Sequence, residues 1–195
     1  MVTVDLDFRL ATVEDAIPLG RLINTAFLAD KTTQVFLTDD RSVDVIDVPT
    51  IIAKISQPDC AVLAVEDRST GSLVAHGSVR KLDNGRAWFG MLAVDVNCQN
   101  RGLGSKVLAW AEQYAYREWG SPRMEFDAVN TRTELIAWYK KRGYLPTGQT
   151  TPFPYERHGN WEGVLRDNLC FINLGKDLGE PHEGPVGPHR TNHRR

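Results

Sequence analysis

Apolar side chains recur every three or four residues in several stretches of the chain, and this spacing predicts amphipathic helices. In the first stretch, Leu19, Leu22, Ile23, Ala26 and Phe27 share one helical face. The first expected helix begins near Asp15, the second runs from Pro49 to Ser56, and the third runs from Gly102 to about Trp119. The fourth follows Thr131-Arg-Thr-Glu134, whose residue types are those of a capping box.

Between the helices lie shorter stretches of β-branched and other apolar residues, which predict strands. The expected strands are Asp7–Leu10, Ala61–Glu66, Leu73–Lys81, Trp88–Val94, Arg123–Val129, Tyr144–Pro146 and Leu169–Leu174. Asp83-Asn-Gly85 predicts a tight hairpin, because Asn-Gly readily adopts positive φ angles. The strand–helix–strand unit from Trp88 to Val129 is expected to be parallel and right-handed. We therefore predict an α/β (α+β) fold with a mixed, mostly antiparallel central sheet flanked by helices.

The composition is that of a globular domain followed by a short polar tail. Of 195 residues, 42% are hydrophobic and 25% are charged, which is enough for one domain with a substantial core. After Lys176 the chain has almost no large apolar residue. We expect a domain over residues 1–176 and a disordered tail over residues 177–195, whose histidines have no fixed metal-ligand spacing.

Charge and cysteine content limit the function classes. The chain has 23 Lys and Arg against 25 Asp and Glu, for a net charge of −2, so it lacks the basic field that binds nucleic-acid phosphates. Three widely spaced cysteines without a C-x-x-C motif favour neither a disulfide framework nor a zinc site. With no visible signal peptide or membrane span, we expect a cytoplasmic protein without nucleic-acid or membrane partners.

The stretch most informative about chemistry runs from Leu92 to Lys106. A strand ends there, a polar loop follows, and two glycines stand where the next helix begins. Free amides at a helix start bind anions, and glycine lets an anion approach the backbone. A dinucleotide-binding turn would need a glycine where Val107 stands, and the phosphate-loop motif G-x-x-x-x-G-K-S/T is absent. What remains is Gln99-Asn-Arg-Gly-Leu-Gly104, a Q-x-x-G-x-G pattern.

This pattern resembles the pyrophosphate-binding motif R/Q-x-x-G-x-G/A of the GNAT superfamily, the acetyl-CoA-dependent N-acetyltransferases. A second match lies downstream, where Asn130 precedes Ala137-Trp-Tyr-Lys-Lys-Arg-Gly-Tyr144. That segment is similar to the family's N…lYek-x-GF element. The two motifs stand in the family's order, and the resemblance covers roughly Phe8 to Lys176.

The resemblance implies acetyl-CoA as co-substrate and assigns residues to it. The strand end at Leu92, Ala93 and Val94 would diverge from its parallel neighbour and bind pantetheine. The pyrophosphate would be held by Gln99, Asn100, Arg101, Gly102, Leu103, Gly104 and Ser105. Asn130 would bond the cofactor, and Tyr139 would contact it and protonate the departing thiolate. The alternatives are a helix-entry turn at Gly102 and Gly104, a turn role for Asn130, a core role for Tyr139 and a solvated charge at Arg101.

The resemblance does not assign a general base. Many relatives use a Glu on the strand before Leu92, but Trp88, Phe89 and Gly90 stand there. The remaining candidates are Glu125, Asp127, His76, Glu156 and His158. Deprotonation of the amine through a water chain is the alternative.

The acceptor site of the family is formed by the loop between the first two helices and by the late hairpin. Here these segments hold Asp39, Asp40, Asp44 and Asp47, and Pro152-Phe-Pro-Tyr155 with Arg157, His158 and Trp161. Carboxylates suit a cationic amine and aromatic rings suit a hydrophobic portion. A solvated acidic loop and a rigid Pro-rich lid are the alternative.

We therefore expect an N-acetyltransferase that acetylates a primary amine, of a small molecule or amino acid, by direct attack in a ternary complex. A protein or peptide N-acetyltransferase is one alternative. A non-catalytic acyl-CoA-binding sensor or interaction module is another, because the strand Glu is absent. The expected partner is the small-molecule amine, and the expected assembly is a monomer or homodimer.

Overall fold

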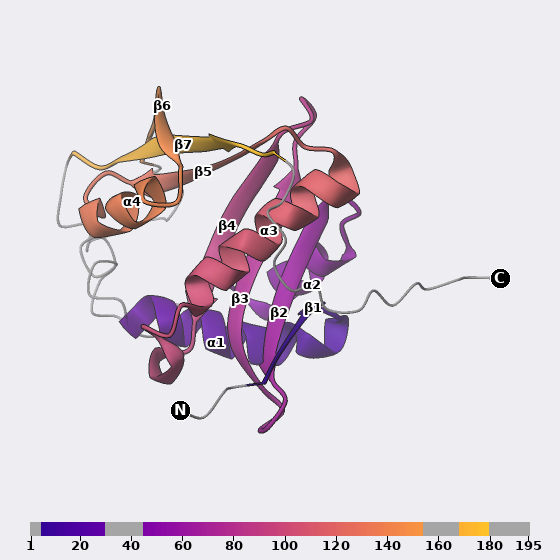
Figure 1. Cartoon of the computed structure of the whole chain (residues 1–195). Coiled ribbons are helices and arrows are strands. Elements are labelled where there is room, and N and C mark those ends of the chain that lie inside the picture. Colours follow the sequence, from indigo (N-terminus) through magenta and orange to yellow (C-terminus); the bar gives the residue numbers. More distant parts are fainter. Residues whose placement is uncertain (1–4, 30–44, 154–167, 180–195) are drawn as a thin grey trace.

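The computed structural model describes residues 5–29, 45–153 and 168–179, which form a seven-stranded sheet with helices on both faces (Figure 1). The strands are β1 (Leu6–Leu10), β2 (Cys60–Asp67), β3 (Ser72–Lys81), β4 (Ala87–Val94), β5 (Arg123–Val129), β6 (Leu145–Pro152) and β7 (Cys170–Asp177). Their order is β1-β2-β3-β4-β5-β7-β6, and only the pair β4–β5 is parallel among these described strands. The predicted fold class is confirmed.

The helices cover both faces of the sheet and bury two apolar cores. They are α1 (Ala16–Ala29), α2 (Val48–Ser56), α3 (Leu103–Trp119) and α4 (Thr133–Lys140). In Figure 1, α3 and α4 lie in front of the sheet, and α1 and α2 lie behind it. The front core includes Phe89, Val107 and Phe126, whereas the rear core includes Leu19 and Ile51. Opposite faces of the same strands therefore pack against different helices, because successive side chains of a strand point to opposite faces.

The two halves of the sheet meet along a short parallel junction. β4 and β5 pair only at Ala87↔Met124 and Trp88↔Glu125, whereas β5 pairs with β7 along its whole length. Just beyond this junction β4 has a bulge against β3, and Met91 takes a φ of 53°. The bulge bends β4 and adds to its divergence from β5.

The starts of the first helix and of α4 differ in how they are capped. At the first helix, the Asp15 carboxylate accepts the Thr12 N–H at 2.8 Å, as a capping box requires, and α1 follows directly. At α4 the capping-box prediction is wrong. Arg132 is the N-cap there without a side-chain cap bond, and the buried Thr131 Oγ1 has no hydrogen-bond partner. The backbone turn Arg132 N–H to Val129 O closes this corner instead.

The last two strands are longer than the sequence indicates. β6 starts after Tyr144 and extends to Pro152, because its threonine-rich half pairs with β7 beyond a register shift. β7 starts at Cys170 and continues to Asp177, which places the end of the described sheet at the predicted start of the tail. Glycine and polar residues hide these extensions from a hydrophobicity pattern.

Candidate functional site

A gap opens between β4 and β5 where their pairing stops. Beyond Trp88 on β4 and Glu125 on β5, neither strand has a partner in the other. β4 stays paired to β3 on its other side, at Ala93 and Val94. The predicted cofactor residues Leu92, Ala93 and Val94 therefore lie on a strand with one edge open to a ligand. An open strand edge presents backbone N–H and C=O groups.

The start of α3 presents unpaired backbone amides. Gly102 is the N-cap, with a φ of 77°, and the first intrahelical bond of this turn is Lys106 N–H to Gly102 O. The amides of Leu103, Gly104 and Ser105 thus precede the helical ladder and have no acceptor within the helix. A Cβ on Gly102 would meet nothing within 4 Å, so the approach is open. These features fit a diphosphate, because the helix dipole adds to the amides.

Local hydrogen bonds shape the loop that leads to α3. The Asp95 carboxylate accepts the Asn97 N–H at 2.8 Å, and Gln99 Nε2 donates to Val94 O at 3.4 Å. Asn100 has a positive φ of 61°, which turns the chain into Gly102. Arg101 is exposed. The structure thus brings the predicted residues 99–105 together around one helix start.

Arg142 contacts this helix start, although sequence patterns assign it only to the end of α4. Its Nε and Nη2 donate to Ser105 Oγ at 3.1 and 2.5 Å, and Nη1 donates to Trp138 O at 2.8 Å. The guanidinium carbon lies 3.5 Å from the centroid of the Trp138 ring. Since Ser105 Oγ accepts both bonds, its own proton is free to point outward. The contact joins residues 37 positions apart, and no local motif predicts it.

Tyr139 lies in the front core beside the gap. Its ring is 4% exposed and packs on Phe126 of β5 with the centroids 4.0 Å apart. Its hydroxyl has no hydrogen-bond partner among the described residues. Burial raises the pKa of Tyr139 above its usual value, which keeps the phenol protonated. The ring therefore has a packing role, and its phenol stays protonated beside the gap.

Asn130 ties the end of β5 to the start of β7. Its Nδ2 donates to Asn168 O at 2.9 Å, and its Oδ1 accepts the Cys170 N–H at 3.3 Å. The Asn130 backbone N–H also donates to Cys170 O at 2.9 Å. In this structure the Asn130 side chain thus bonds to backbone groups of the protein itself.

Three of the candidate bases are described, and they differ in their surroundings. His76 is 3% exposed, with Nδ1 2.9 Å from Leu63 O, and burial lowers its pKa to about 4. Glu125 accepts guanidinium N–H groups from Arg86 and Arg123 at 2.7 and 2.9 Å on one oxygen. Asp127 is half-buried, and its described partner is an amide.

Several predicted acceptor residues fall outside the described ranges. They are Asp39, Asp40, Asp44, Pro154, Tyr155, Glu156, Arg157, His158 and Trp161, together with the tail histidines His182, His189 and His193. Asp47 is described and is the N-cap of α2, where its carboxylate accepts the Thr50 N–H at 2.9 Å. Phe153 stacks on Phe171 with the ring centroids 5.5 Å apart.

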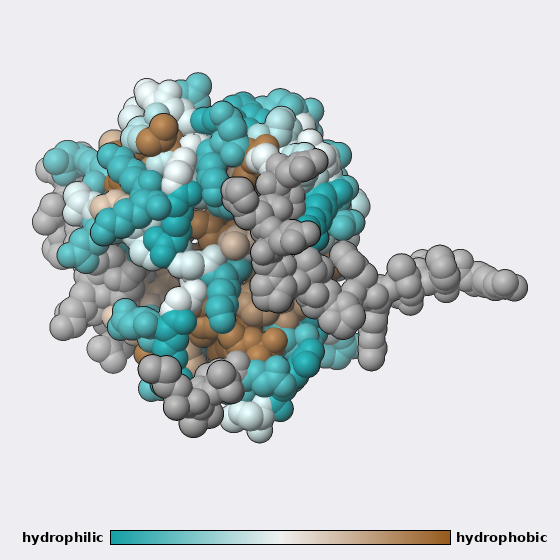
Figure 2. Space-filling view, viewed as in Figure 1, coloured by the Kyte–Doolittle hydropathy of each residue, from teal (hydrophilic) through white to brown (hydrophobic). Residues whose placement is uncertain are grey.

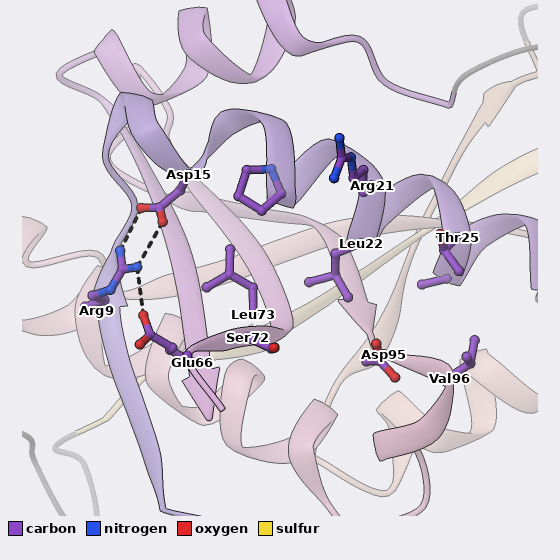
Figure 3. Close-up of a pocket in the computed structure, with 13 residues that line it drawn as sticks. Arg9, Asp15, Arg21, Leu22, Thr25, Glu66, Ser72, Leu73, Asp95 and Val96 are labelled. Carbon is purple, nitrogen blue, oxygen red and sulfur yellow. Dashed lines mark hydrogen bonds and ion pairs between the residues drawn. The ribbon is translucent and has the colours of Figure 1, made fainter. Parts of the chain in front are cut away.

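A groove of about 470 Å³ lies elsewhere, between the start of α1 and the loop after β4 (Figure 3). Arg9 forms its polar wall by donating to Asp15 at 2.7 and 2.9 Å and to Glu66 at 3.1 Å. These carboxylates raise the pKa of Arg9 and fix its charge. None of the predicted site residues lines this groove, and Arg9, Asp15 and Glu66 already satisfy one another.

The described ranges hold neither a metal-ligand cluster nor a membrane-spanning helix. No cluster of three or more His, Cys, Asp or Glu side chains there is placed to hold a metal ion. Helices of sufficient length and hydrophobicity to cross a bilayer are likewise absent from those ranges.

The sequence profile of the Acetyltransferase (GNAT) family matches residues 28–144, which include both motifs. No curated protein matches the chain in sequence. Solved structures that share the fold include three N-acetyltransferase-related proteins of low identity. Each is similar to the chain in fold alone, because all three are below 25% identity.

The first is an acetyltransferase-like protein from Salmonella typhimurium with its cofactor acetyl-CoA, with a TM-score of 0.64 and 21% identity over 94% of this chain and 99% of that one. The second is the ribosomal-protein-S18-alanine N-acetyltransferase of Escherichia coli, with a TM-score of 0.66 and 12% identity over 94% and 100%. The third is a spermidine N-acetyltransferase chimera from Vibrio cholerae and hSSAT, with a TM-score of 0.63 and 11% identity over 89% and 95%.

Proposed function

Because the chain belongs to the acetyltransferase (GNAT) family, we propose that it transfers the acetyl group of acetyl-CoA to a primary amine of a small molecule or amino acid. One observation carries this proposal: the open edge of β4 leads to the free amides at the start of α3. A ligand with an extended amide-bearing arm and a diphosphate fits both features together. The related Salmonella structure contains acetyl-CoA, which supports the choice of ligand.

In this proposal each end of the co-substrate has its own residues. The amides of residues 99–105 and the outward Ser105 proton bind the diphosphate, and Arg142 holds Ser105 in place. The backbone of Leu92, Ala93 and Val94 bonds the pantetheine arm along the gap. Asn130 needs to release Asn168 or Cys170 before its side chain can bind the same ligand.

The chemistry then needs little from the side chains. Acetyl-CoA supplies an acetyl group activated as a thioester. A backbone N–H of β4 stabilises the oxyanion that forms when the amine nitrogen bonds the carbonyl carbon. Tyr139 donates its phenolic proton to the departing sulfur, and solvent returns a proton from the amine nitrogen to Tyr139. The raised pKa of Tyr139 keeps that proton in place until the carbon–sulfur bond breaks.

Replacing Tyr139 with phenylalanine tests the acid. The Tyr139→Phe variant keeps the ring and its packing on Phe126 but loses the proton donor. We expect kcat to fall by about 10- to 1000-fold while the affinity for CoA stays within about twofold. Steady-state kinetics and calorimetry measure the two quantities. An unchanged kcat would leave Tyr139 as a core residue only.

A non-catalytic acyl-CoA-binding module is the second candidate. The observation that favours it is the absence of a carboxylate at Trp88, Phe89 and Gly90 of β4. Incubating the wild-type chain and acetyl-CoA with a panel of primary amines, and measuring free thiol, separates the two functions. Thiol release with any amine excludes the module, whereas tight CoA binding without release supports it.

The amine panel also separates small molecules from proteins. The structural similarity to the Escherichia coli enzyme, which is a ribosomal-protein-alanine N-acetyltransferase, motivates including peptides with a free N-terminus. We expect small amines to give a higher kcat/KM than peptides, because the near balance of 23 Lys and Arg against 25 Asp and Glu provides no field that would steer a charged peptide to the site. A peptide preference would assign the chain to the protein N-acetyltransferases.

A further inference from the structure

A row of small and polar residues crosses the rear face of the sheet at the β4–β5 gap. Ser78 of β3 pairs with Gly90 of β4, and Asp127 of β5 pairs with Asn173 of β7. Trp88 and Glu125 form the last pair of the β4–β5 junction, so Gly90 and Asp127 are the corresponding positions two residues further on. Met124, Phe126 and Ala128 belong to the front core, so Asp127 faces the rear.

This row is unlike its surroundings on the rear face. Ser78 and Asn173 are each 7% exposed, and a Cβ built on Gly90 would meet nothing within 4 Å. The rear core nearby is apolar, with Val62 and Ala93 among its members. A sheet face that buries polar groups beside open space is typical of a binding site, because water-excluded polar groups destabilise the fold unless something bonds them.

Two acceptor atoms in the row, Asp127 Oδ1 and Asn173 Oδ1, are poorly hydrogen-bonded. Asn173 Nδ2 donates to Asp127 Oδ1 over a long 3.4 Å, and Asn173 Oδ1 is buried without any hydrogen-bond partner. No lysine or arginine of the described ranges forms an ion pair with Asp127. By contrast, two guanidinium groups satisfy the neighbouring Glu125.

We propose that Asp127 and Asn173 form the subsite for the acceptor amine, with Asp127 as the general base. This inference rests on the proposed acetyl transfer and names the site that it leaves open. A primary ammonium group has three donors and no acceptor, so it complements a carboxylate with one long hydrogen bond and an amide oxygen with none. The ligand class is therefore a protonated primary amine.

The position of Asp127 suits it to the proton transfer. One ammonium N–H proton moves to a carboxylate oxygen of Asp127, which leaves the nitrogen with a free electron pair and Asp127 neutral. The electron pair forms the C–N bond and the carbonyl becomes the oxyanion, and the C–S bond then breaks as Tyr139 protonates the sulfur. The nitrogen loses its second proton through solvent to Tyr139, and Asp127 releases its proton to solvent. Burial raises the pKa of the Asp127 carboxyl above its usual value, with a smaller contribution from Glu125, and thereby makes it a stronger base.

The Asp127→Asn variant removes the charge and the basicity and keeps the shape. We expect kcat/KM for a strongly basic amine to fall about 100- to 1000-fold. A weakly basic amine that is already neutral at the assay pH needs no base, and the loss should then be below about tenfold. Calorimetry on the CoA complex should show at least tenfold weaker binding of the basic amine, with unchanged affinity for CoA.

Two further variants complete the experiment. Asp83→Asn makes the same chemical change in an exposed hairpin and should match the wild type. Asn173→Ser should raise KM for the amine about tenfold with a small effect on kcat. If the melting temperature of Asp127→Asn differs from that of the wild type, the KM of Asn173→Ser is the result that tests the inference. Equal losses for basic and neutral amines, or wild-type KM in Asn173→Ser, would overturn the inference. The absence of thiol release from the wild type would instead overturn the proposed acetyl transfer.

Discussion

The burial of His76 makes the folded state less stable at acidic pH. Its ring is 3% exposed behind β3, its Nδ1 lies 2.9 Å from Leu63 O, and burial lowers its pKa to about 4. In the unfolded chain the pKa of histidine is about 6.5. Below that value the unfolded state binds a proton that the folded state rejects, so stability decreases as the pH falls toward 4.

We predict that His76 alone lowers the free energy of unfolding by up to about 3 kcal/mol between pH 7 and pH 4, which is the pKa difference converted to energy. Urea unfolding across this range measures the loss. His76→Asn can still donate to Leu63 O but cannot be protonated, so its stability should depend less steeply on pH. Equal slopes for the two proteins would mean that the ring reaches water when charged.

Residue types alone do not separate the candidate bases. The sequence makes Glu125 and Asp127 equivalent, since both are carboxylates on one face of the same strand. The structure distinguishes them by their partners: Arg86 and Arg123 bind Glu125, and Asn173 binds Asp127. Arg86 and Asn173 are 39 and 46 residues away from their partners. Hydrogen bonds over such distances leave no local signal.

At the scale of elements, α3 depends on one close approach to β3. A Cβ on Gly77 would lie 2.6 Å from Val107 Cγ1 and 3.2 Å from Phe89. Glycine at this position therefore lets the helix settle on the strand, and it fixes where the free amides of α3 stand relative to the β4 edge.

The Gly77→Ala variant should lose about 1–3 kcal/mol of stability, because the added methyl group overpacks the α3–β3 contact. We also expect weaker CoA binding, since α3 carries the amides. Gly90→Ala on the adjacent strand adds the same methyl group in open space and should change stability by less than about 0.5 kcal/mol. Thermal unfolding with and without CoA measures both. Equal stability of the two variants would show that α3 shifts without strain.

Most elements were predictable because their residues are periodic. Each described α-helix and strand overlaps a predicted one, although β6 and β7 extend beyond their predicted ends, and the parallel junction follows from the order of elements. The start of α4 was not predictable, since Thr131 and Glu134 have capping-box residue types but Arg132 takes the cap position. The polar half of β6 pairs with β7 through its backbone, which side-chain hydrophobicity does not report.

At the scale of the whole molecule, the sheet consists of two parts joined by the short parallel junction between β4 and β5. β1–β4 form one antiparallel part and β5, β7 and β6 form the other. Two backbone pairs and the Arg86–Glu125 ion pair connect them at the closed end, and Arg142 connects α4 to α3. Figure 2 shows brown apolar surface between the teal polar regions on the α3 face. A ligand lying along the gap would contact both parts.

CoA should therefore stabilise the segments along the β4–β5 gap more than the rest of the fold. At 100 times its dissociation constant, a ligand that binds only the folded state adds about 2.7 kcal/mol to the free energy of unfolding. We predict that hydrogen exchange slows most at Leu92–Val94 and at Leu103–Ser105, and less within the β2–β3 pair, because the ligand would bond the free backbone groups of these two segments. Gly102→Ala, whose left-handed φ of 77° disfavours alanine, should lose this protection. Uniform slowing across the sheet would place the ligand elsewhere.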